Sequence, residues 1–212
     1  MSGCCKPSGY ERLFSAKQAR LDADRYRKRG LGGTSRRLVD LAGDVSGETV
    51  LEVGGGVGAI ELDLLAAGAD RATNVELSGE YEEEAEKLIA ERGLSERVDR
   101  RVADFVTEPV EPHDVVVMHR VVCCYPDVDR LVGVAAASTR RRLLLTYPRE
   151  RPWTRVGIRA VNFFMRISGS DFRAFVHPVA RMAAAAQREG LRLERRERAD
   201  LIWENAAYER AG

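Results

Sequence analysis

The chain has 212 residues, of which 44% are hydrophobic and 32% charged, and its formal net charge at pH 7 is +1. This length and composition are typical of a single globular domain with a sizeable core, and the balanced charge excludes the strong basic field that would indicate a nucleic-acid-binding protein. Because no stretch approaches the roughly 20 apolar residues of a membrane span, and the start lacks the apolar core of a signal peptide, we expect a cytoplasmic protein.

The first 43 residues are expected to form a helical cap ahead of the main domain, which spans 44–212. A partial apolar stripe predicts a helix over 10–29 that ends at Gly30. The basic cluster at 25–29 is interpreted as a solvated helix face. Contact with an anionic substrate, with nucleic acid or with the headgroups of a membrane remains the alternative.

The most informative motif is the run Thr49-Val-Leu-Glu-Val-Gly-Gly-Gly-Val-Gly58. It predicts a buried strand that enters a tight turn and then opens a helix, with glycines where a ligand would lie against the backbone. Glu76 follows about 20 residues later, at the expected tip of the adjacent strand, where a carboxylate can accept the hydroxyls of a ribose. The run does not fit the dinucleotide pattern G-x-G-x-x-G, because Ala59 occupies the place of the third glycine.

Beyond this motif, strand-like and helix-like stretches alternate, which predicts an α/β fold with a doubly wound parallel sheet. Strands are expected near 49–53, 72–76, 99–103, 114–118 and 142–147. Helices are expected from an N-cap at Thr34 or Ser35 to Ala42, and near 57–67, 79–92, 127–137 and 178–189. The last two extended runs, Leu191–Glu197 and Leu201–Tyr208, are expected to pair as a hairpin.

An apolar insertion at 148–178 separates the fifth strand from this hairpin, and arginines are interleaved along it. Chain inserted here lies over the carboxyl ends of the strands, where ligands bind in open α/β sheets. We therefore favour a helical lid over the substrate, with a packed accessory helix as the alternative.

Three segments together resemble the cofactor motifs of the class I S-adenosylmethionine (SAM)-dependent methyltransferases: the acid-x-G-x-G-x-G spacing of Glu52, Gly54, Gly56 and Gly58; the acid Glu76; and Ala103-Asp104-Phe105. The resemblance covers most of 10–208 and is nearest to the magnesium-protoporphyrin O-methyltransferase-like group. It implies a seven-stranded, mostly parallel sheet whose last strand is antiparallel.

The same resemblance implies SAM as the cofactor and assigns residues to its parts. The glycine turn, including Gly55, would hold the methionine end, and Glu76 would hold the ribose. Asp104 and Phe105 would hold the adenine. The remaining cofactor-binding candidates are Glu52, Leu77 and His119.

The segment after the fourth strand, Met118–Asp127, is expected to pass beneath the methyl group. It lacks the (Asn/Asp)-Pro-Pro-(Tyr/Phe) turn of DNA and protein amino-methylating relatives, and it resembles the Glu-Val-Leu-Glu-His-Val-Pro-Asp pattern of small-molecule O-methyltransferases. Some of these relatives hold a divalent ion with the acid and histidine of that pattern. Arg120 and the pair Cys123-Cys124 stand in their place here, so no metal ion is expected.

Catalytic candidates follow from the same segment. His119 leaves the fourth strand at the cofactor end and titrates near neutral pH, so it is the preferred general base; alternatively, it orders the loop through a hydrogen bond. Tyr125 is a second catalytic candidate. Tyr147 and His177, each near the expected mouth of the site, are substrate-binding candidates.

All four cysteines occur as adjacent pairs, Cys4-Cys5 and Cys123-Cys124. In a reducing compartment such pairs do not indicate a disulfide framework. Neighbouring side chains are expected to point apart, which makes buried small hydrophobes the simpler interpretation. The alternative is that residues 1–9 fold over the pocket, so that thiolates from both pairs, with Cys123 and Cys124 as substrate-binding residues, meet a soft metal, a metalloid or a thiol.

The sequence thus predicts a SAM-dependent methyltransferase that acts on a small molecule, with oxygen as the preferred acceptor. Cysteine-assisted methylation of a thiol, metal or metalloid, and a SAM-binding regulatory module without catalysis, remain alternatives. Nucleic acid is disfavoured as a partner, and the oligomeric state is not determined.

Overall fold

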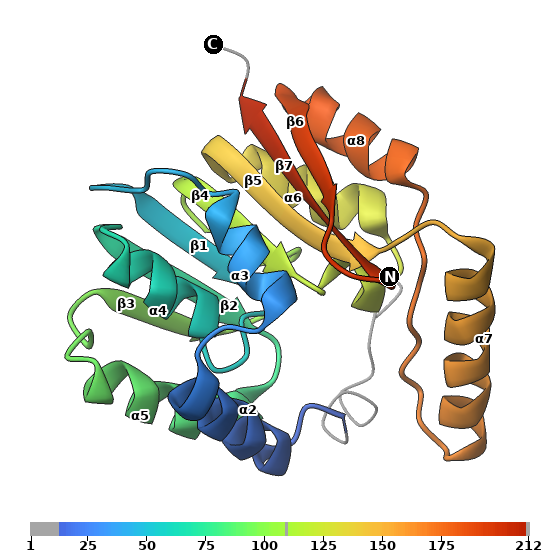
Figure 1. Cartoon of the computed structure of the whole chain (residues 1–212), viewed down its shortest axis with the longest axis horizontal. Helices are drawn as coiled ribbons and strands as arrows, with labels where there is room; N and C mark the ends of the chain where they lie inside the picture. The colour runs from blue at the N-terminus through green and yellow to red at the C-terminus, as the bar shows by residue number, and fades with distance from the viewer. Residues whose placement is uncertain (1–12, 109, 211–212) are drawn as a thin grey trace.

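The computed structural model describes residues 13–108 and 110–210. At its centre lies a seven-stranded sheet with the order β3-β2-β1-β4-β5-β7-β6 (Figure 1). The strands are β1 (Thr49–Val53), β2 (Arg71–Glu76), β3 (Val98–Val102), β4 (His113–His119), β5 (Thr139–Pro148), β6 (Leu191–Arg198) and β7 (Trp203–Arg210). Strands β1 to β5 are parallel, whereas β7 runs antiparallel to both of its neighbours. The predicted α/β topology is confirmed.

The terminal hairpin has a longer turn than the sequence predicts, since β7 begins at Trp203 and not at residue 201. The Asp200 carboxylate accepts hydrogen bonds from the backbone N–H groups of Ile202 and Trp203, at 2.8 and 2.7 Å. These bonds hold Leu201 and Ile202 in the turn and leave both side chains exposed.

Alternating side chains of the central strands pack into two separate hydrophobic cores, one on each face of the sheet. On β4, Val115 and Val117 pack on one face of the sheet, while Val116 and Met118 pack on the other, as the two-residue period of a strand requires. All four side chains are fully buried. Both faces must therefore be covered by helices, which explains the near-continuous apolar run in the sequence.

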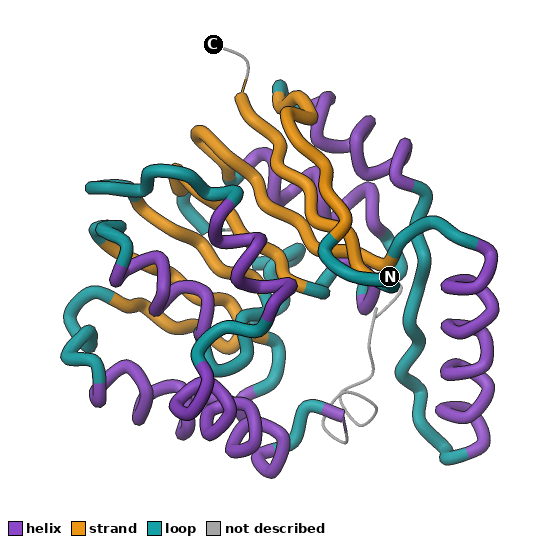
Figure 2. Tube along the Cα trace, in the orientation of Figure 1, coloured by secondary structure: helices purple, strands orange, loops and turns teal. Residues whose placement is uncertain are grey.

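Helices cover the two faces of the sheet in separate groups (Figure 2). One core includes side chains from α6 (Val128–Ala137) and α8 (Val179–Arg188). The opposite face is covered by α3 (Gly33–Asp40) and α4 (Ala59–Ala66). Beside them, α2 (Ala16–Arg29) packs on α5 (Glu82–Glu91), which follows the short helix η1 (Gly79–Tyr81).

The N-terminal helices begin at positions that differ from the sequence-based expectation. Within the described residues, α2 starts at Ala16, after Ser15 accepts a cap hydrogen bond from the backbone N–H of Gln18 at 3.4 Å. The N-cap of α3 is Gly32, so the expected cap at Thr34 or Ser35 is wrong. Ser35 turns its hydroxyl back to the Gly32 carbonyl, and Thr34 uses its own for a contact described below.

The insertion forms one long helix, α7 (Pro152–Ile167), at one side of the molecule (Figure 1). Proline at its first turn suits a helix start, where no backbone donor is needed. Both polar atoms of the Asn162 amide bond the backbone of Ala174, at 2.8 Å each, and so join α7 to the returning chain. Among the described residues, no helix is long and apolar enough to cross a membrane.

Candidate functional site

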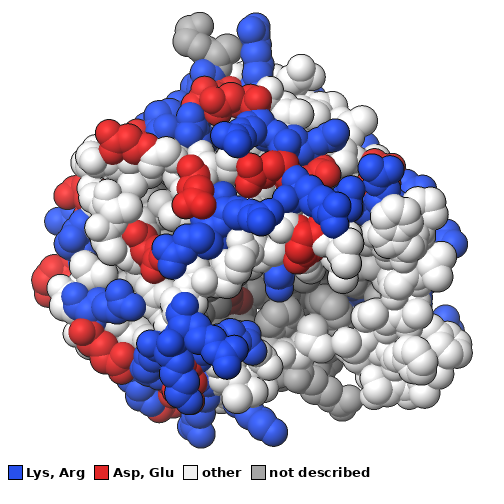
Figure 3. Space-filling model, viewed as in Figure 1, with Lys and Arg blue, Asp and Glu red and all other residues white. Residues whose placement is uncertain are grey.

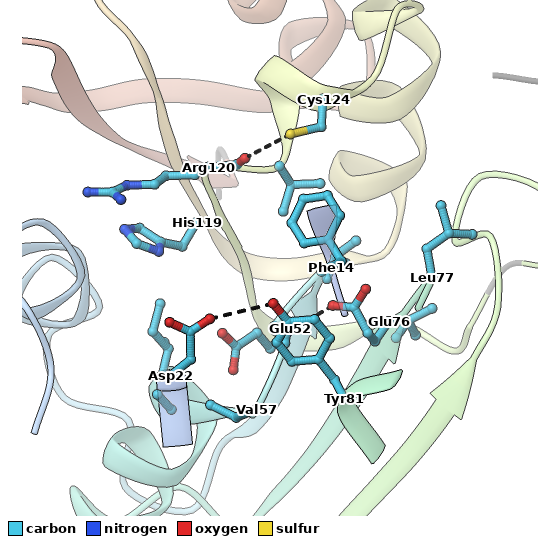
Figure 4. A pocket seen from close by; sticks show the side chains of 18 of the residues that line it. Phe14, Asp22, Glu52, Val57, Glu76, Leu77, Tyr81, His119, Arg120 and Cys124 are labelled. Atoms are coloured by element: carbon cyan, nitrogen blue, oxygen red, sulfur yellow. Dashed lines mark hydrogen bonds between the residues drawn. The ribbon is translucent and has the colours of Figure 1, made fainter. Parts of the chain in front are cut away.

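A cavity of about 600 Å³ opens at the carboxyl ends of β1, β2 and β4, a volume typical of small-molecule sites. Its walls come from the glycine turn, from the chain after β2, β3 and β4, and from α2 (Figure 4). Eleven of the sequence-predicted site residues line it: Glu52, Gly54, Gly55, Gly56, Glu76, Leu77, Asp104, Phe105, His119, Cys124 and Tyr125. No residue of 148–178 is among the lining residues, whereas several residues of α2 are, and the lid role of the insertion stays a prediction.

Glu76 is held at the tip of β2 by backbone donors. One carboxylate oxygen accepts a hydrogen bond from the N–H of Gly56 at 2.9 Å, and the other accepts one from Ser78 at 3.0 Å. Burial raises the pKa of Glu76, and these backbone N–H groups oppose that rise by stabilising the anion. The turn and the acid, which lie 20 residues apart in the sequence, therefore form one unit.

The other predicted acid, Glu52, is buried next to the glycine turn. It is 2% exposed, and its carboxylate accepts a hydrogen bond from the N–H of Glu61 at the start of α4, at 2.8 Å. Glu61 in turn accepts from the Asn74 amide at 2.9 Å and lies 3.6 Å from the guanidinium of Arg100. Burial raises the pKa of Glu52 well above its usual range and that of Glu61 to about 7.

This polar network explains two of the glycines better than ligand contact does. A Cβ on Gly55 would lie 2.3 Å from the Asn74 amide nitrogen and 2.7 Å from the Glu52 carboxyl carbon. A Cβ on Gly58 would lie 2.3 Å from a Glu61 oxygen, and its φ of 78° is left-handed. Gly58 is not among the residues that line the cavity, and its contact with the cofactor stays a prediction.

The adenine-side candidates lie at the turn that follows β3. The Asp104 carboxylate accepts a hydrogen bond from the N–H of Val106 at 3.0 Å, and the Asp104 carbonyl accepts from the N–H groups of Thr107 and Glu108, so these bonds close the turn. Phe105 is 4% exposed and packs into the core next to the cavity. Both residues remain candidates for holding an adenine ring.

Residues of α2 and of the chain just before it also line the cavity. Among them, Arg25 and Tyr26 belong to the basic cluster at 25–29, for which contact with an anionic substrate was the alternative interpretation. The Phe14 ring contacts the rings of Tyr81 and Phe172, with centroids 6.5 and 6.2 Å apart. Asp22 faces the Tyr81 hydroxyl at 3.5 Å, and this contact is drawn in Figure 4. These contacts join segments far apart in the chain, which local patterns do not reveal.

At the end of β4, His119 and Arg120 share the hydroxyl of Thr34. Arg120 donates to the Thr34 oxygen at 2.9 Å, and the His119 Nε2 lies 3.1 Å from the same oxygen. Because this oxygen already accepts from a cation, its own hydrogen is available for Nε2. Burial and the neighbouring guanidinium lower the pKa of His119 to about 3. This geometry favours the loop-ordering role of His119 over the preferred general-base role.

Arg120 has an uncommon backbone conformation for a residue with a side chain. Its φ is +63°, the left-handed region, and it is the only non-glycine residue with positive φ in the described part of the chain. The guanidinium stacks on the ring of Trp203, 4.6 Å from the centroid. Among the described residues, no carboxylate lies within 4.0 Å of it. A cation with no close anion thus borders the cavity.

The two cysteines of the short helix η2 (Val122–Cys124) point the same way, contrary to expectation. Their sulfur atoms lie 3.7 Å apart, and both approach the Arg120 carbonyl, at 3.1 and 3.6 Å. A tight helical turn brings adjacent side chains closer than an extended strand does. Cys124 lines the cavity, whereas Cys123 is buried and does not. The other pair, Cys4-Cys5, lies outside the described residues.

Two substrate-binding candidates lie away from the cavity. The side chain of Tyr147 is only 1% exposed, because its position on β5 turns the ring into the core. Its hydroxyl donates a hydrogen bond to the Glu204 carboxylate at 3.2 Å. His177 stacks on Phe175, and its Nε2 lies 2.9 Å from the Tyr125 carbonyl. Neither candidate lines the cavity, and a substrate-binding role stays a prediction for both. Tyr125 does line it, and its catalytic role stays a prediction.

Two features define the fold class of this protein. They are the five parallel strands followed by an antiparallel hairpin, and the cavity at the carboxyl ends of β1, β2 and β4. This is the fold of the class I SAM-dependent methyltransferases, and the predicted resemblance is confirmed at that level. No protein-family model matches the sequence, and no curated protein matches it.

Solved structures supply the particular likenesses. The magnesium protoporphyrin IX methyltransferase of Synechocystis PCC 6803, with bound S-adenosylhomocysteine, is similar with a TM-score of 0.68 at 20% identity, over 90% of this chain and 94% of that one. An O-methyltransferase family protein from Burkholderia thailandensis is similar with a TM-score of 0.71 at 17% identity, over 95% and 63%. The geranyl diphosphate C-methyltransferase of Streptomyces coelicolor A3(2) is similar with a TM-score of 0.69 at 14% identity, over 84% and 77%. At such identities the likeness shows the fold alone.

Proposed function

We propose that this protein is a SAM-dependent methyltransferase that acts on a small molecule through an oxygen atom. The observation that carries the proposal is the convergence of the glycine turn, Glu76 and the Asp104–Phe105 turn on one cavity. The solved methyltransferases of this fold with SAM or S-adenosylhomocysteine bound support the choice of cofactor.

The residues present fit this cofactor chemically. Glu76 offers carboxylate oxygens to the ribose hydroxyls, and the apolar face of Phe105 offers packing to the adenine. The turn at 54–56 presents backbone to the cavity and no side chains. When bound, SAM supplies a methyl group already activated by its sulfonium charge, so the protein mainly has to align the acceptor and exclude water.

The residues at the end of β4, His119 and Arg120, favour a methyl acceptor that carries a negative charge before it reacts. A hydroxyl acceptor needs a base near neutral pH, and the low pKa of His119 makes it a poor one. A carboxylate needs no base, and Arg120 can balance its charge by a hydrogen-bonded ion pair. We therefore place the acceptor carboxylate at Arg120, with His119 and Thr34 as positioning residues.

Isothermal titration with SAM tests the cofactor assignment. We expect Glu76→Ala to weaken SAM binding at least about tenfold, since two hydroxyls lose a charged acceptor. Glu86→Ala, an exposed glutamate on α5, is the matched control and should bind like the wild type. Equal affinities of the wild type and Glu76→Ala would discard the proposal.

The acceptor is tested with isotopically labelled SAM and a metabolite extract, with products read by mass spectrometry. We expect labelled methyl esters that mild alkali hydrolyses, and we expect Arg120→Gln to abolish them while SAM affinity persists. Arg130→Gln, an exposed arginine on α6, serves as the control. Alkali-stable methyl ethers as the sole products would refute the carboxylate assignment.

A second candidate is methylation of a thiol, metal or metalloid assisted by cysteine. It is favoured by the 3.7 Å separation of the two sulfur atoms and by the position of Cys124 at the cavity. It predicts that Cys123→Ser/Cys124→Ser loses turnover while SAM still binds. Full turnover in that variant rejects this candidate and leaves the carboxylate proposal standing.

A further inference from the structure

Helix α7 carries a row of exposed apolar side chains. Trp153, Phe163, Phe164 and Ile167 are each 60% exposed or more, and Val156 is 62% exposed. A soluble surface rarely gathers large apolar groups in this way unless the patch binds something. In Figure 3 the side of the molecule formed by α7 is mostly white, with blue at its margin.

The row is continuous because its members recur at helical spacing. Positions 153, 156, 160, 163, 164 and 167 fall on one face of a helix of 3.6 residues per turn. A neighbouring stripe is basic, with Arg155, Arg159 and Arg166 all exposed. The helix contains no acidic residue, so it carries three positive charges over 16 residues.

The orientation of this face is set by the opposite side of the helix. Thr154 is 5% exposed, and Asn162 bonds the backbone of Ala174 through both amide atoms. Ile158 and Met165 are partly buried on the same side. Since these contacts anchor the inner side to the protein, the apolar row faces away from the described residues.

We propose that α7 lies flat on an anionic membrane surface. An apolar face rich in tryptophan and phenylalanine, beside an arginine stripe, is the composition of interfacial helices, which bury the apolar face at the headgroup boundary. At 16 residues the helix is about 24 Å long, long enough to place four aromatic or aliphatic side chains in the interface. Anionic headgroups would neutralise the three arginines.

Charge favours lipid over a second copy of the chain. Pairing two α7 faces would bring two basic stripes together, and α7 offers no carboxylate to separate them. Anionic headgroups supply the missing negative charge, and each basic residue near such a surface strengthens binding about fivefold. The observations therefore point to a lipid surface as the occupant.

Flotation of the full chain with vesicles tests this inference. We expect binding to vesicles of phosphatidylglycerol mixed with phosphatidylcholine, little binding to phosphatidylcholine alone, and weaker binding at high salt. Phe163→Ser/Phe164→Ser should lower binding at least about tenfold. Arg155→Gln/Arg159→Gln/Arg166→Gln should lower it about fivefold per residue. All five side chains are exposed, so the fold should survive, which circular dichroism checks.

Two matched controls locate the contact. Leu201→Ser/Ile202→Ser removes exposed apolar groups from the β6–β7 turn, and Lys17→Gln/Lys28→Gln/Arg29→Gln removes exposed positive charge from α2. Both should bind vesicles like the wild type. Failure of the wild type to bind, or an equal loss in the α2 control, overturns the proposal. A lipid-free dimer that Phe163→Ser/Phe164→Ser dissociates would instead identify α7 as an interface between copies, which also overturns it.

Discussion

Replacing Thr34 by valine removes one hydroxyl from the end of β4 and keeps the shape of the side chain. The hydroxyl accepts from the Arg120 guanidinium at 2.9 Å and contacts the His119 Nε2 at 3.1 Å. A hydrogen bond to a charged group contributes about 1.5–3 kcal/mol when it is buried, and a neutral one about 1 kcal/mol. Because this site is only partly buried, we expect Thr34→Val to lower the free energy of unfolding by about 2 kcal/mol, measured by urea denaturation.

The same variant should release the imidazole from a single tautomer. We expect the Thr34 hydroxyl of the wild type to donate to Nε2, which would place the proton on Nδ1, so nitrogen NMR should show Nε2 unprotonated. With a pKa of about 3, the ring should stay neutral down to below pH 5. Since the unfolded chain binds this proton at about pH 6.5 and the folded chain does not, His119 lowers stability as the pH falls below 6.5.

Thr73→Val is the matched control, because Thr73 makes a similar contact of 3.0 Å with the Nε2 of His113, at the opposite end of β4. We expect a smaller loss of stability there, about 1 kcal/mol, because the contact involves no charged group, and no change in turnover. Thr34→Val should reduce turnover, since Arg120 loses its anchor beside the cavity. A His119 ring that titrates near pH 6.5 in the wild type, or that carries its proton on Nε2, would refute the reasoning and restore the general-base role.

Three further predictions concern packing and buried charge. Gly55→Ala should destabilise the protein by at least about 2 kcal/mol, read by thermal unfolding, because its Cβ would meet the Asn74 amide at 2.3 Å; wild-type stability would show that the turn relaxes freely. Glu61, whose pKa is raised from 4.5 to about 7, favours its protonated form when folded, so stability from this group is full below pH 4.5 and is lost as the pH rises through 7. Glu61→Gln should remove this part of the pH dependence, up to about 3 kcal/mol, and an unchanged pH profile would contradict the assignment. Tyr147→Phe should cost about 1 kcal/mol through its lost bond to Glu204 and leave turnover intact; a loss of turnover would return Tyr147 to the site.

Much of the cofactor side could be predicted because its signals are local. The strand, turn and helix around 49–66 need glycines and apolar residues at fixed spacing, and Glu76 follows at the distance that one crossover sets. Their meeting at one cavity follows from the parallel sheet, whose strand ends share an edge. Gly56 and Glu76 were predicted in this way, whereas Glu52, Leu77 and Asp104 were predicted from the family resemblance, and all five line the cavity.

The substrate side resisted prediction because its contacts join distant parts of the chain. Whether Tyr147 faced the cavity or the core depended on strand register, and the sequence left that undetermined. The role of Thr34 depended on α3 lying against the end of β4, 85 positions away. The side-by-side sulfur atoms of Cys123 and Cys124 depended on a helical turn in place of extended chain.

By itself the sequence determined the α/β class and the position of the glycine turn, since periodicity and backbone sterics act over a few residues, and its family resemblance implied the antiparallel last strand. Only the tertiary structure decided that His119 and Arg120 share the Thr34 hydroxyl, that no carboxylate of the described residues lies close to Arg120 at the cavity, and that α7 turns its apolar row outward. Those outcomes depend on which surfaces meet when the chain folds, and burial and charge pairing between distant residues set them.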